Sequence, residues 1–177
     1  MIKKMSKVFF EDVTDDIVEL ANNIINQNKN DLYDVYKIIT HGEKFKILFF
    51  STLEGEDLPP KYEKRAGFIR VVSDIDRVTK NYSFEIVLNK KLWYNLNNTK
   101  TQESILFHEL YHIVLGRDKN DNIKENIDGS YHVKLKKHDI ELGAFSDVIL
   151  KYGQDSIDYK QIDYLKTQIQ IDLLNEG

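Results

Sequence analysis

The sequence predicts an α+β fold in which a small, mostly antiparallel sheet packs on one apolar helix, with further helices toward both ends of the chain. Helical periodicity is strongest near the two ends, short aromatic and aliphatic segments lie between them, and a nearly continuous apolar stretch spans 105–115. At 177 residues the chain fits a single domain that is large enough to bury a core. We expect a helical N-terminal part over 1–42 and a core over 43–177.

The elements follow in order along the chain. Apolar residues at helical spacing predict a first helix over 14–28, with Thr14 as its N-cap, and a shorter helix over 31–39. Alternating and aromatic segments then predict four strands, and the last part of the chain returns to helical spacing. The expected strands are 45–50, 66–72, 82–88 and 131–135, and the expected C-terminal helices are 139–151 and 158–175.

The most specific motif is His108-Glu109-Leu110-Tyr111-His112, which matches the H-E-x-x-H signature of zinc hydrolases when it lies on a helix. Thr99 and Gln102 make a capping box that would open such a helix, and Gly116 would end it. We therefore expect the apolar stretch up to Leu115 to be helical and buried.

Residues four apart share one face of a helix, so His108 and His112 could bind one Zn²⁺, with Glu109 as the general base. Burying two histidines and a glutamate without partners costs free energy, and a metal ion would satisfy all three. The structural alternative is a pair of hydrogen-bonded core histidines beside a chance glutamate.

A catalytic zinc ion needs a third protein ligand. Asp118 lies at about the offset of the third ligand in metzincins, but that class also places a methionine turn beneath the zinc, and the only methionines here are Met1 and Met5. Glu141 would suit a gluzincin, in which a following helix provides a glutamate. From the residues alone, the candidates for the third ligand remain Asp118, His132, His138, Asp139 and Glu141.

Several segments together resemble the phage metallopeptidases, small zincin-like proteins of bacteriophages and prophages that are distantly similar to SprT-like proteases. The resemblance covers roughly residues 60–153. It implies a zincin-like fold, Zn²⁺ bound by His108, His112 and His138, a catalytic Glu109, and a peptide or protein substrate. The chain departs from the family pattern by about two extra residues between Glu141 and Phe145 and in the polar segment 116–131. The segments that carry the resemblance are 64–70, 84–89, Leu92-Trp93, 106–113, 133–141, Phe145 and 151–153.

Composition narrows the remaining function classes. A net charge of −4 with mixed signs gives no reason to expect a nucleic-acid partner, and the absence of cysteine excludes disulfides and cysteine zinc sites. Neither a signal peptide nor a membrane span is expected, which places the protein in the cytoplasm of a host cell, with the virion as an alternative location. The alternative function is a catalytically silent zincin-fold structural or binding protein whose partners would be phage structural proteins.

Overall fold

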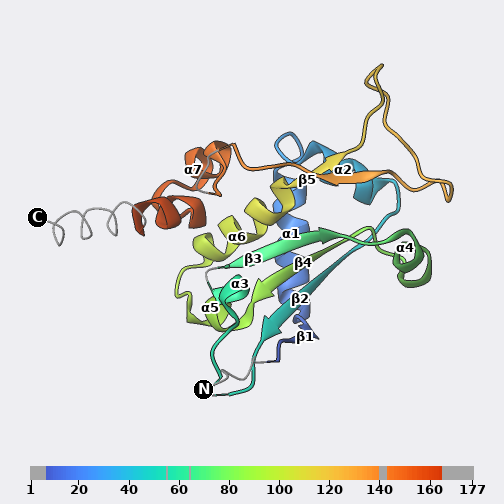
Figure 1. Cartoon of the computed structure of the whole chain (residues 1–177). Coiled ribbons are helices and arrows are strands. Elements are labelled where there is room, and N and C mark those ends of the chain that lie inside the picture. Colours follow the sequence, from blue (N-terminus) through green and yellow to red (C-terminus); the bar gives the residue numbers. More distant parts are fainter. Residues whose placement is uncertain (1–6, 55, 64, 140–142, 165–177) are drawn as a thin grey trace, which may run out of the picture.

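The computed structural model describes residues 7–54, 56–63, 65–139 and 143–164 (Figure 1). Its main feature is a four-stranded sheet with the strand order β1-β2-β4-β3. The central pair β2–β4 is parallel and the two outer pairings are antiparallel, so the α+β fold class is confirmed with a mixed sheet. The strands are β1 Phe9–Asp12, β2 Phe45–Ser51, β3 Gly67–Val71 and β4 Phe84–Asn89.

The strands form because their side chains alternate between two apolar faces. In β2, Ile47 and Phe49 join the main core, whereas Leu48 and Phe50 point to a smaller cluster on the opposite face of the sheet. All six residues of β4 are buried, as expected for a strand between two neighbours with both faces covered. The three predicted strands in this part of the chain are therefore confirmed within one or two residues at each end.

The N-terminal part is not purely helical. The two expected helices are present as α1 (Asp15–Gln27) and α2 (Tyr33–Thr40). Ahead of them, however, β1 pairs with β2 and forms an edge of the sheet. The expectation of a helical part over 1–42 was wrong for this strand, because all four residues of β1 are exposed and show no alternation of buried and exposed positions.

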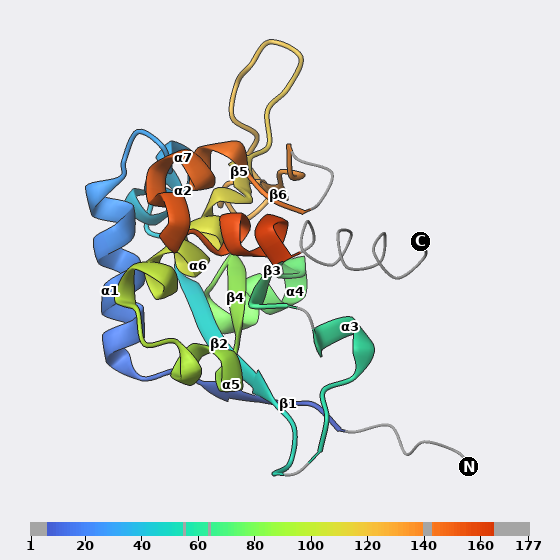
Figure 2. The ribbon, with the colours of Figure 1, turned by 90° about the vertical axis from the view of Figure 1, so that its left-hand side faces the viewer.

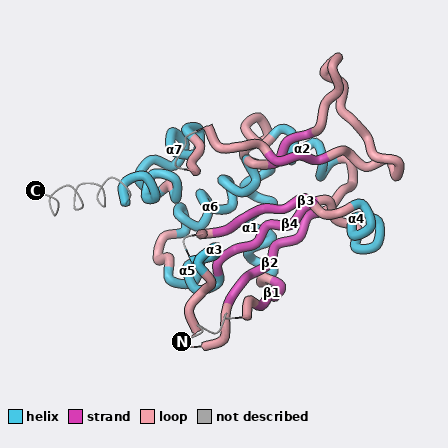
Figure 3. Tube along the Cα trace, in the orientation of Figure 1, coloured by secondary structure: helices cyan, strands magenta, loops and turns pink. Residues whose placement is uncertain are grey.

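The helix that carries the H-E-x-x-H motif, α6, spans Thr99–Tyr111 and packs against β3, β4 and α1 (Figure 3). Its N-cap is Asn98 rather than Thr99, and it ends before Gly116. The expected helical residues Ile113–Leu115 form strand β5 instead, which pairs antiparallel with β6 (Val133–Leu135). The strand pairing replaces the helical hydrogen bonds at this end, and the branched side chains of Ile113 and Val114 suit a strand.

The remaining elements complete the surroundings of α6. Residues 116–132 form an extension that projects from the body of the molecule (Figure 1). Beyond it, α7 and the helix over 157–164 lie beside α6 (Figure 2). The helix expected over 139–151 starts later than predicted, and the end of the one expected over 158–175 lies outside the described residues. These elements are α3 Pro60–Glu63, α4 Asp74–Lys80, α5 Lys90–Asn95, α7 Ser146–Tyr152 and the 3₁₀ turn η1 Gly153–Asp155.

In the part of the chain that the structure describes, no helix combines the length and apolar character needed to cross a bilayer.

Candidate metal centre

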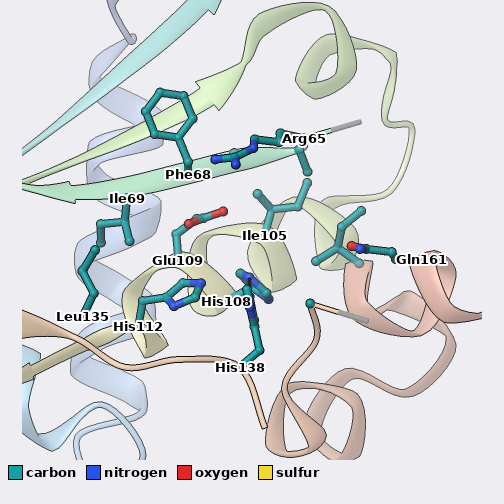
Figure 4. Close-up of a pocket in the computed structure, with 14 residues that line it drawn as sticks. Arg65, Phe68, Ile69, Ile105, His108, Glu109, His112, Leu135, His138 and Gln161 are labelled. Carbon is teal, nitrogen blue, oxygen red and sulfur yellow. Dashed lines mark hydrogen bonds between the residues drawn. The ribbon is translucent and has the colours of Figure 1, made fainter. Parts of the chain in front are cut away.

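Three histidine side chains meet at the C-terminal end of α6 (Figure 4). His108 and His112 lie one helical turn apart, with their ring centroids separated by 5.0 Å. His138, which follows β6, approaches both, with centroid distances of 5.1 Å to His108 and 4.5 Å to His112. One ring nitrogen from each of the three lies within 4.8 Å of the others. The structure thus brings together three of the sequence-predicted residues.

The spacing of the ring nitrogens suits a tetrahedral metal ion. His138 Nε2 lies 3.2 Å from His108 Nε2. Two nitrogen ligands of a tetrahedral Zn²⁺, each about 2.0–2.1 Å from the metal, would lie about 3.3–3.4 Å apart. Three imidazoles without a cysteine are also a ligand set typical of a catalytic zinc site. The residues present therefore fit a bound zinc ion.

The outer ring nitrogen of each helical histidine lies close to an oxygen atom that orients the ring. His112 Nδ1 lies 2.7 Å from the carbonyl oxygen of Lys136, and the Lys136 N–H donates to the His112 carbonyl at 2.6 Å. His108 Nδ1 lies 2.8 Å from Oδ1 of Asp158. An acceptor at Nδ1 favours the tautomer with its proton there, which leaves Nε2 of each ring with a free lone pair.

The electrostatics keep two of the three rings neutral near pH 7. Burial, together with the neighbouring histidines, lowers the pKa of His112 to about 4, although the hydrogen bond to the Lys136 carbonyl opposes this shift. Burial and His108 also lower the pKa of His138. For His108, burial opposes protonation, but the Asp158 carboxylate and the charge of Glu109 raise the pKa on balance. Metal binding needs neutral imidazoles, so His112 and His138 are ready to bind and His108 must release its proton.

Glu109 lies on the same helix, buried at 4% exposure, and lines the cleft next to the histidines (Figure 4). Burial, together with the charge of Asp158, raises its pKa to about 7, against the opposing effects of His108 and Arg65. Strand β3 passes close by, since a Cβ added at Gly67 would lie 3.1 Å from the Glu109 carboxylate oxygen. A glycine at this position leaves room for the carboxylate beneath the strand.

The cleft around these groups has a volume of about 390 Å³. Residues 65–69, in and just before β3, line one wall, and α6 lines the opposite one. Apart from the histidines, Arg65 is the only basic residue among the described residues that line the cleft. Because β3 is an edge strand of the sheet, an extended chain in the cleft would run beside it.

A family model described as "Putative phage metallopeptidase" matches residues 9–168. The chain belongs to this family. No curated protein and no solved structure gives a match. The match extends the resemblance seen over 60–153 to include the first strand and the helix over 157–164. Membership of a metallopeptidase family, together with the histidine cluster, indicates a metal-binding protein that acts on peptides or proteins.

The other third-ligand candidates in this chain lie away from the three histidines or outside the described residues. Asp118 is a turn residue that accepts backbone N–H bonds from Asn120 and Asn122. His132 packs against Gly116, outside the three-histidine cluster. Asp139 accepts the backbone N–H of Ser146, the first residue of α7, at 3.0 Å. Glu141 is outside the described residues.

Two residues next to the histidines were not singled out as functional by the sequence. Asp158 lay at the start of an expected helix, where an acidic residue is ordinary, and Phe145 was only part of the family resemblance. No spacing rule links either residue to the motif, because Asp158 is 50 positions from His108 and reaches it only through the fold. Conservation of both Phe145 and Asp158 across related chains would be the sequence signal that identifies them.

Proposed function

We propose that this chain is a zinc peptidase of the zincin type, with Zn²⁺ bound by His108, His112 and His138 and with Glu109 as the catalytic base. The observation that carries the proposal is the meeting of three imidazoles and one buried carboxylate in a single cleft. We treat residues 1–177 as one domain built around this cleft. On the strength of its phage family, we place its action in the host-cell cytoplasm.

The three histidines and the groups that orient them form the proposed metal site. The three histidines direct ring nitrogens to a common point, and the Lys136 carbonyl and the Asp158 carboxylate hold the outer nitrogens of two of them. Bound there, Zn²⁺ would supply Lewis-acid chemistry, polarising a peptide carbonyl and lowering the pKa of water.

Glu109 is the group that accepts and donates protons during the proposed reaction. Its raised pKa of about 7 suits a group that must both accept and release a proton near neutral pH. It takes a proton from the attacking water and transfers it to the nitrogen of the leaving amine, which completes hydrolysis of the peptide bond. Residues that exclude bulk water from this exchange include Ile105 and Ile157, which line the same cleft.

Substrate binding uses the edge of the sheet. Among the described residues, β3 pairs only with β4, so its other edge offers backbone N–H and C=O groups to an extended peptide. Ile69 and Leu135 line the cleft near His112 and would contact apolar side chains of the substrate (Figure 4).

Hydrolysis by the zinc-loaded wild type and by Glu109→Gln tests the proposal. A peptide library analysed by mass spectrometry is expected to be cleaved by the wild type, and Glu109→Gln should retain zinc while losing roughly 10²–10⁴-fold in rate. The matched control is Glu103→Gln, on the same helix but outside the cleft lining, which should cleave at the wild-type rate. Equal rates for wild type and Glu109→Gln would refute the role of Glu109, and the absence of any cleavage would favour the silent binding protein.

A further inference from the structure

Phe145 packs against all three histidines of the cluster. Its ring centroid lies 5.2 Å from that of His108 and 4.8 Å from those of His112 and His138. The side chain is fully buried and also contacts the Tyr111 ring at 5.0 Å. A rigid aromatic ring in this place limits the rotation of each imidazole without offering a competing hydrogen bond.

Asp158 supports the same group from a neighbouring element. Its side chain is 1% exposed, its Oδ1 lies 2.8 Å from His108 Nδ1, and the same oxygen accepts the Phe145 N–H at 3.4 Å. The 2.8 Å contact with His108 is a close polar contact, and neither His108 Nδ1 nor Asp158 Oδ2 makes a regular hydrogen bond among the described residues. A buried carboxylate so weakly partnered needs a positive charge nearby.

The start of the helix over 157–164 is fixed to α6, which keeps Asp158 in place. The Ser104 hydroxyl accepts the backbone N–H of Ile157 at 3.0 Å and lies 3.3 Å from the Asp155 carbonyl. The Ser156 hydroxyl accepts the N–H of Asp158 at 3.1 Å. Asp158 is therefore held in place through the backbone of residues 157 and 158, independently of its contact with the histidine.

We propose that Phe145 and Asp158 are the positioning residues of the metal centre: the Phe145 ring forms a floor beneath the three histidines, and the Asp158 carboxylate orients the His108 ring. The unit takes the place that the methionine turn has in metzincins, a feature that this chain lacks. The inference rests on the proposed zinc site, and it concerns how strongly that site holds its metal.

Zinc affinity, measured by competition with a coloured chelator, tests both residues. Asp158→Asn should lower the affinity about 10–100-fold, and Asp158→Ala, which offers no acceptor, should lower it further. Phe145→Leu should also weaken binding, whereas Phe84→Leu, at a fully buried phenylalanine in β4 that stacks on Phe45, should destabilise the fold without changing the affinity. Asp155→Asn, at a half-buried acid near Asp158 whose carboxylate accepts a hydrogen bond from the Asn98 side chain, is the matched control for charge.

A second readout does not need the metal. In the metal-free wild type, at a pH high enough for the His108 ring to be neutral, the nitrogen NMR shifts of the ring should show the proton held on Nδ1, and in Asp158→Ala the proton should be shared between both nitrogens. This measurement holds even if Phe145→Leu fails to fold.

The outcomes separate this inference from the proposed function. Zinc bound equally by the wild type, Asp158→Asn and Phe145→Leu would overturn the positioning roles and leave the zinc site standing. A wild type that binds no zinc would overturn the proposed function, and the positioning role of Asp158 would then be decided by the His108 tautomer alone. Unchanged ring nitrogen shifts in Asp158→Ala would contradict it in either case.

Discussion

Removing the charge of Glu109 should stabilise the metal-free protein. Burial raises the pKa of this carboxyl from 4.5 to about 7, so the folded state holds the ionised form at a cost. Each pKa step of one corresponds to about 1.4 kcal/mol, and the full rise therefore costs about 3 kcal/mol at pH values well above 7. Glutamine has nearly the same shape and no charge, so Glu109→Gln should recover most of that amount.

The sign of the effect depends on pH. A carboxyl whose folded-state pKa is raised binds more protons in the folded state, so stability falls as the pH rises from about 4.5 to about 7 and then stays low. Urea denaturation in the presence of a chelator should give a gain of about 3 kcal/mol for Glu109→Gln at pH 8 and almost none at pH 4.5. Equal stabilities of the wild type and Glu109→Gln at pH 8 would show that the buried Glu109 carboxylate does not destabilise the folded protein.

Three further predictions concern the cleft. Arg65→Ala removes a positive charge that lowers the pKa of Glu109, so the acidic limb of the pH–rate profile should move to higher pH, whereas Lys61→Ala, outside the cleft lining, should leave it unchanged. Gly67→Ala places a Cβ about 3 Å from the Glu109 carboxylate and should lower kcat while zinc remains bound, as a steady-state assay with zinc analysis will show. The raised pKa of His108 means that Zn²⁺ displaces a proton there, so zinc affinity should fall as the pH drops below neutral, with proton release visible by calorimetry in buffers of different ionisation heat.

The local motif was readable from the sequence because it depends only on helix geometry. Four-residue spacing on an apolar helix placed His108 and His112 together, and the structure places them so. His138 could be selected only through the family resemblance, since it reaches the site by way of the β5–β6 pairing, and that pairing lies where a helix was expected. Its proximity to the helical pair is a consequence of topology.

The supporting residues could not be predicted, because their roles arise from tertiary packing. Asp158 and Phe145 meet His108 through elements far apart in the chain, and nothing in their local sequence distinguishes them from an ordinary helix start and an ordinary core residue. Strand β1 was not predicted for a related reason. Backbone hydrogen bonds pair it with β2, and its exposed side chains show no alternation of apolar and polar residues.

The binding of one zinc ion by three histidines can be tested by metal analysis of single variants. Purified wild type and His132→Ala, a matched histidine outside the cluster, should each carry one zinc per chain. His108→Ala and His138→Ala should lose it, because two imidazoles cannot hold the ion against a chelator. Stoichiometric zinc retained by His138→Ala would contradict a three-histidine site and assign the third ligand to another residue.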